Sequence, residues 1–107
     1  MAWRRACGRT DVDDGEAMQT EWEPPVAVFN VDREFFALAD TCTHDESSLA
    51  DGYVDGDIVE CAWHFAKFSI RTGAVLSPPA TRPVCAYQVR ITGDDVMVDV
   101  PESGESA

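Results

Sequence analysis

Apolar and polar residues alternate over short runs along most of this 107-residue chain, and turn-forming residues separate the runs. Alternation with a period of about two indicates β-strands with one buried face, whereas an amphipathic helix needs a period of about 3.6. We expect strands over residues 2–7, 18–23, 26–31, 34–39, 67–70, 74–76, 87–92 and 96–100. Many short strands with a turn about every 8–12 residues predict an all-β, antiparallel sandwich or barrel.

The same pattern predicts how the chain is organised. Residues 26–39 and 87–100 each contain a central turn sequence and therefore predict two hairpins. Residues 41–57, in contrast, are rich in Asp, Ser and Gly and show no regular alternation. We expect a single domain in which a β base (1–40 and 86–100) carries a small, loop-rich insertion (41–85), followed by an acidic tail (101–107).

The charge and the longest apolar runs exclude some classes of function. Eight Lys and Arg against twenty Asp and Glu give a net charge of −12, which would repel the phosphates of nucleic acid. No apolar run approaches the ~18 residues of a membrane helix, so we expect no membrane partner. The pair Arg4-Arg5 is followed by a polar stretch rather than an apolar one, which argues against an export signal. We therefore expect a cytoplasmic protein.

Two short ligand pairs are the strongest chemical signal in the chain. They are Cys42-Thr43-His44 and Cys61-Ala62-Trp63-His64, and they include both histidines of the protein. In Rieske-type [2Fe–2S] centres two thiolates hold one iron and two imidazoles hold the other. We expect Cys42, His44, Cys61 and His64 to bind one such cluster. The other two cysteines, Cys7 and Cys85, have no histidine at ligand spacing and are expected to be small packing residues.

A structural zinc site with two cysteines and two histidines is the competing interpretation of these four residues. Zinc fingers, however, usually pair like ligands on each loop. A mixed Cys/His pair on each loop instead supplies one ligand to each iron of a binuclear cluster. The electron count also suits histidine: two ferric ions, two sulfides and two thiolates sum to zero charge, and a neutral cluster accepts an electron more readily than one held by four thiolates.

The ligand pairs and the residues around them resemble a known family. The segments are 40–44, 48–56, 59–64 and 68–73, together with Pro79-Ala80. They resemble the Rieske-type ferredoxins of bacterial aromatic-ring-hydroxylating dioxygenases, and the resemblance extends over about residues 3–100. It departs from the family at Ala62, where proline is frequent, and at Phe65, where glycine is frequent. Neither departure removes a ligand.

The resemblance implies a Rieske-type fold and a one-electron carrier. Its expected partners are an NADH-dependent flavoprotein ferredoxin reductase, which supplies the electron, and a terminal ring-hydroxylating oxygenase, which receives it. We expect a monomer that is not itself an enzyme, since both histidines are committed and none remains for a mononuclear iron. No Gly-x-Gly-x-x-Gly nucleotide fingerprint occurs either. The alternatives are a permanently bound Rieske subunit of another oxidoreductase and a zinc-held binding module.

The resemblance also predicts the reduction potential. High-potential Rieske proteins have a disulfide between the two ligand loops, whereas this chain has Ser47 and Trp63 at those positions. They also have serine and tyrosine hydroxyls that donate to sulfur, whereas this chain has Ala66 and Phe68. Fewer donors stabilise the reduced state less, so we expect a potential at the low end of the Rieske range. Asp45 and Glu46, beside a ligand histidine, are candidates for steering this tip toward basic partner surfaces.

Overall fold

Strands are the main regular element within residues 2–41, 48–61, 66–77 and 83–100, the part that the computed structural model describes. The strands are β1 (Ala2–Gly8), β2 (Ala17–Gln19), β3 (Val26–Val31), β4 (Glu34–Ala39), β5 (Tyr53–Asp55), β6 (Ile58–Glu60), β7 (Lys67–Ser69), β8 (Val75–Ser77), β9 (Ala86–Tyr87), β10 (Val89–Thr92) and β11 (Asp95–Val100). One short 3-10 turn, η1 (Leu49–Asp51), precedes β5. The expected all-β class is confirmed.

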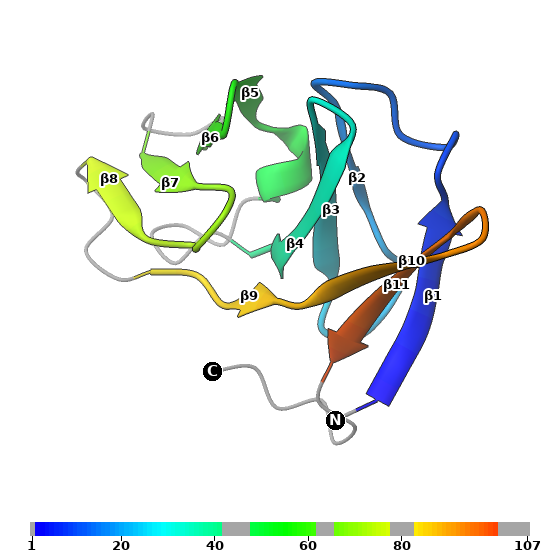
Figure 1. Ribbon diagram of the computed structural model, residues 1–107. Coiled ribbons are helices and arrows are strands. Elements are labelled where there is room, and N and C mark those ends of the chain that lie inside the picture. Colours follow the sequence, from blue (N-terminus) through cyan, green and yellow to red (C-terminus); the bar gives the residue numbers. More distant parts are fainter. Residues whose placement is uncertain (1, 42–47, 62–65, 78–82, 101–107) are drawn as a thin grey trace.

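Three antiparallel sheets make up the fold (Figure 1). Their strand orders are β1-β11-β10, β2-β3-β4-β9 and β5-β6-β7-β8. The third sheet is formed by consecutive strands and lies on the opposite side of the molecule from β1 (Figure 1). All four of its strands fall between residues 41 and 85. The division into a base and an insertion stays a prediction, which these pairings support.

Strand β3 lies at the centre of the molecule, and all six of its residues are buried. Because neighbouring side chains point to opposite faces, β3 contributes to two separate cores. Ala27, Phe29 and Val31 pack in the core that includes β6 and β7, whereas Val26 and Val28 pack in the core against β11. Apolar side chains of β3, together with Leu38 of β4, therefore pack the third sheet against the base.

The two predicted hairpins are present, with one change. Strands β3 and β4 pair from Val26 opposite Ala39 to Val31 opposite Glu34, and β10 pairs with β11. The stretch predicted as one strand over 87–92 is, however, divided at Gln88. Its first part, β9, pairs with β4 and its second part, β10, pairs with β11. The break follows from a change of partner sheet, which a local pattern does not reveal.

Two other expectations about strands were wrong. The strand predicted over 18–23 ends at Gln19, because the chain folds back and the Thr20 amide donates to the Val26 carbonyl at 2.9 Å. The segment 41–57 was expected to be irregular, yet it contains η1 and β5. Strand β5 forms a hairpin with β6 in which Asp55 pairs with Ile58 around Gly56, whose φ is +61°. Gly-Asp is a recognised two-residue hairpin turn, so this signal was present in the sequence.

No helix in the described part of the chain has the length and apolar character needed to cross a membrane.

Candidate metal centre

Cys61 is the one predicted ligand that lies within the described residues. It follows directly after β6, and its side chain has 0 % exposure. It belongs to the core that also contains Phe29, Leu38 and Phe68. Apolar side chains from both the base and the third sheet therefore determine where this thiol sits.

A backbone hydrogen bond joins the two residues that flank 62–65. The Cys61 amide donates to the Ala66 carbonyl at 2.7 Å, so the residues before and after 62–65 lie close together. Ala66 is itself fully buried and leads into β7. The hydrogen bond sets the separation between the two ends of the segment that carries His64.

A second closure lies at the other predicted ligand segment. Thr41 and Ser48 form an isolated antiparallel bridge on either side of 42–47. The Leu49 amide donates to the Asp40 carbonyl at 2.7 Å, directly behind that bridge. Backbone contacts thus join the residues on either side of both 42–47 and 62–65.

Cys42, His44 and His64 lie outside the described residues, as do the residues named beside them, which are Asp45, Glu46, Ser47, Ala62, Trp63 and Phe65. Among the described residues no group of three or more His, Cys, Asp or Glu side chains gathers in a form that could hold a metal ion. The assignment of the four ligands therefore stays a prediction. Its support from the described residues is the buried position of Cys61 and the two loop closures.

Ala66 and Phe68 lie beside Cys61 in the same core, and both have 0 % exposure. These are the positions at which the sequence lacks the two hydroxyls of high-potential relatives. Because both side chains are buried and purely apolar, neither can donate a hydrogen bond to a sulfur.

Cys7 is a buried cysteine that we expect to serve only in packing. It is 4 % exposed, and it lies in the second core with Val96 and Val98. Burial raises the pKa of the Cys7 thiol, and the nearby Asp11 carboxylate raises it further. A buried thiol of raised pKa is a poor nucleophile, as expected for a packing residue.

A polar network behind the first ligand segment was not foreseen. Asp40 is 1 % exposed, and its carboxylate accepts hydrogen bonds from Gln19, Ser48 and Ala50. The only sequence signal for it is its place two residues before Cys42. A charged residue within a strand pattern is normally assigned to the solvent face, which is why it was missed.

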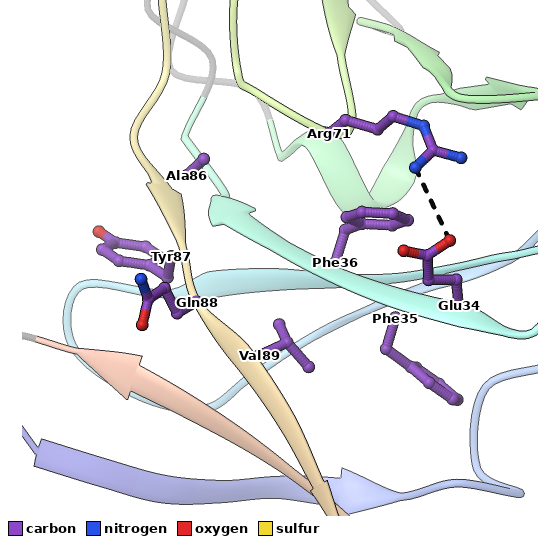
Figure 2. A pocket seen from close by; sticks show the side chains of 8 residues that line it. All are labelled: Glu34, Phe35, Phe36, Arg71, Ala86, Tyr87, Gln88 and Val89. Atoms are coloured by element: carbon purple, nitrogen blue, oxygen red, sulfur yellow. Dashed lines mark ion pairs between the residues drawn. The ribbon is translucent and has the colours of Figure 1, made fainter.

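A shallow groove of about 350 Å³ lies elsewhere, between β4 and the segment of β9 and β10 (Figure 2). Arg71 extends over the Phe36 ring at 5.0 Å and forms ion pairs with Glu34 at 3.7 Å and with Asp57 at 3.2 Å. Since Asp57 follows β5 and Glu34 opens β4, Arg71 links the third sheet to the base. None of the residues that line the groove is a predicted ligand.

Comparison with known proteins agrees with this arrangement. The family model of the Rieske [2Fe-2S] domain matches residues 2–98. The chain is 52% identical over 101 residues to the biphenyl dioxygenase ferredoxin subunit of Pseudomonas sp. (strain KKS102), covering 92% of this chain and 93% of that protein.

Two solved structures are similar over nearly the whole chain. A ferredoxin of Sphingomonas yanoikuyae B1 has a TM-score of 0.88 and 40% identity, covering 94% of this chain and 100% of that one. A chain from the complex of reduced oxygenase and oxidized ferredoxin in carbazole 1,9a-dioxygenase has a TM-score of 0.86 and 34% identity, with coverage of 90% and 100%. Sequence and fold thus agree, and the chain belongs to the Rieske [2Fe-2S] domain family.

Proposed function

We propose that this protein is a one-electron carrier in a multicomponent system that hydroxylates aromatic rings. It takes electrons from an NADH-dependent flavoprotein reductase and delivers them to a terminal oxygenase. The observation that carries the proposal is the 52% identity, over 93% of its length, to the ferredoxin subunit of a biphenyl dioxygenase. A ferredoxin chain of similar fold that is seen with its oxygenase in the carbazole system supports the same role.

The residues of this chain fit a [2Fe–2S] cluster. Cys42 and Cys61 would supply the two thiolates, and His44 and His64 would supply two neutral imidazoles. Cys61 meets the requirement for a ligand inside a dry site, because it is fully buried among apolar side chains. When bound, such a cluster accepts and returns a single electron. The family match favours this group over zinc, which was the alternative for the same donors.

The proposal also covers the localisation, the oligomeric state and the catalytic activity of the protein. We infer a cytoplasmic monomer that catalyses no reaction of its own. Four cysteines in a chain assigned to a reducing compartment suit metal binding rather than disulfides. A monomeric mass by analytical ultracentrifugation would support a diffusing carrier, whereas a stable complex with another subunit would support the permanently bound alternative.

The direct test of the function is reconstitution. The purified holoprotein is mixed with a flavoprotein reductase, NADH and a biphenyl-type oxygenase, and dihydroxylated product is measured against NADH consumed. We expect product only when all three proteins are present. Turnover that is equally fast without this chain would contradict the proposed role.

We expect the midpoint potential of the wild-type protein to lie at the low end of the Rieske range, and Ala66→Ser to raise it. A serine hydroxyl at this buried position beside Cys61 can donate to a sulfur and favour the reduced state. One hydrogen bond of about 1 kcal/mol corresponds to a shift on the order of 50 mV for one electron. The measurement is a redox titration followed by EPR.

Ala37→Ser is the matched control for this shift. Ala37 is also buried, but it lies in the second core against β11. A hydroxyl there should cost stability without changing the potential. An equal shift in both variants, or a wild-type midpoint well above zero, would contradict the interpretation.

Reversing the charge of Asp45 and Glu46 together is expected to slow electron delivery to the oxygenase severalfold at low ionic strength. The reason is the loss of electrostatic steering, which fades as salt screens charges beyond about 8 Å at 0.15 M. Stopped-flow reduction of the oxygenase at several salt concentrations measures the effect. Reversal of Asp13 and Asp14, two exposed carboxylates between β1 and β2, makes the same change in net charge away from the ligand segments. Equal rates for all three proteins at low salt would refute the steering role.

A further inference from the structure

Asp40 combines deep burial with a full set of hydrogen-bond donors. One carboxylate oxygen, Oδ2, accepts from Gln19 Nε2 at 2.7 Å. The other, Oδ1, accepts from Ser48 Oγ at 2.9 Å and from the Ala50 amide at 2.9 Å. With 1 % exposure, the carboxylate has almost no contact with solvent.

The main chain of Asp40 is held as firmly as its side chain. Its amide donates to the Pro25 carbonyl at 3.1 Å, and its carbonyl accepts from the Leu49 amide at 2.7 Å. Asp40 therefore connects β2 and the start of β3 with η1, the first element after the ligand segment 42–47. The hydrogen bonds of this one residue therefore join the residues before and after that segment.

No cation neutralises this buried carboxylate in the part of the chain that the structure describes. The ion pairs found there involve Arg5 and Arg71, and neither pairs with Asp40. The three donors on Asp40 are an amide side chain, a hydroxyl and a backbone amide, which are all uncharged. Burial of an unpaired charge is costly even when its hydrogen bonds are made, so Asp40 lowers the stability of the fold relative to an apolar residue of the same shape.

Asp40 is also covalently close to the proposed cluster. Cys42 follows it by two residues, and two trans peptide links span at most about 7.6 Å between Cα atoms. A negative charge on the order of 10 Å from the added electron, in surroundings with an effective dielectric constant of about 20, changes the equilibrium constant of reduction by about tenfold. Among the described residues, the donors on Asp40 are uncharged and no ion pair includes it, so they offset that effect only in part.

We propose that Asp40 is a positioning residue for electron transfer. Its hydrogen bonds hold both ends of the segment that carries Cys42 and His44, and its negative charge keeps the reduction potential low. This inference rests on the proposed function, because it requires Cys42 and His44 to be cluster ligands. The missing hydroxyls at positions 66 and 68 are one cause of a low potential, and the charge of Asp40 is a second, independent cause.

The test compares the midpoint potentials of Asp40→Asn and Ser48→Ala with that of the wild-type holoprotein. Asparagine has nearly the same shape but no charge, so Asp40→Asn should favour reduction by about tenfold, a positive shift of about 59 mV for one electron. Ser48→Ala removes one donor and keeps the charge, so it should shift the potential slightly in the opposite direction. Asp14→Asn is the matched control, since Asp14 is an exposed carboxylate that accepts one hydrogen bond, from the Asp32 amide at 2.7 Å. Its potential should equal that of the wild type.

Hydrogen exchange measured by mass spectrometry over residues 48–60 tests the anchoring role separately. Both Asp40→Asn and Ser48→Ala should exchange faster than the wild type there, whereas Asp14→Asn should not. If the wild type holds the cluster and Asp40→Asn leaves the potential unchanged or lowers it, the charge role is wrong. If Asp40→Asn fails to take up the cluster, the midpoint potential of Ser48→Ala tests the charge role instead. A positive shift of that potential overturns the proposal. A wild-type protein without iron would instead overturn the proposed function itself.

Discussion

Replacement of Cys61 by alanine is expected to abolish cluster binding and, with it, all electron delivery to an oxygenase. One thiolate of the proposed pair is lost, and the other described residues of its core, which include Phe29, Leu38 and Phe68, have no side chain that could replace it. Alanine fits the buried site with the loss of one sulfur atom, so we expect the fold to survive with a cost on the order of 1 kcal/mol. Iron and acid-labile sulfide content, together with the EPR spectrum of the dithionite-reduced protein, measure the outcome.

Cys7→Ala is the matched control for that experiment. Cys7 is nearly as buried as Cys61, but it lies in the core formed with Val96, Val98 and Val100. Its loss removes a sulfur of similar size from a similar apolar setting, so both variants should lose similar stability. Only Cys61→Ala should lose the iron. A Cys61→Ala protein with the full iron content of the wild type would show that the ligand assignment is wrong.

The largest loss of stability from a single methyl group is expected for Gly73→Ala. Gly73 has a φ of +78°, and a Cβ atom there would lie 2.1 Å from the Val84 carbonyl oxygen. The Val84 amide donates to the Gly73 carbonyl at 3.0 Å, so the two backbones cannot separate without breaking that bond. The left-handed conformation and the forced separation together should cost at least ~3 kcal/mol. Urea denaturation followed by circular dichroism measures this cost.

Gly56→Ala separates the two contributions. Gly56 also has a positive φ, of +61°, but no heavy atom lies within 4 Å of the position that its Cβ would take. Only the conformational penalty remains, which is about 1–2 kcal/mol for a residue in the left-handed region. Equal losses in the two variants would mean that the contact with Val84 adds nothing.

The contact between Gly73 and Val84 could not be predicted from the sequence. Gly73 lies between the strands expected over 67–70 and 74–76, and a turn before β8 is present there. Its second role, close approach to the backbone of Val84 eleven residues away, depends on long-range packing. No periodic pattern contains that information.

Asp40 illustrates the same limit at the candidate site. The ligand pairs could be found in the sequence because the spacing within each pair is covalent. The donors to Asp40 come instead from Gln19, twenty-one residues earlier, and from Ser48 and Ala50 beyond the ligand segment. A buried carboxylate satisfied by such distant groups cannot be distinguished in the sequence from an exposed one.

The all-β class, the hairpin of β3 and β4, and the family of the Cys/His pairs could be predicted from the chain, because alternation and spacing act over a few neighbouring residues. The three-dimensional fold was needed to show that β1 pairs with β11, that β9 pairs with β4 rather than continuing into β10, and that Cys61 lies in a core shared by two sheets. These features depend on which apolar faces meet and on which distant backbone groups find partners. That choice is made by the packing of the whole domain, in which β3 must bury both of its faces at once.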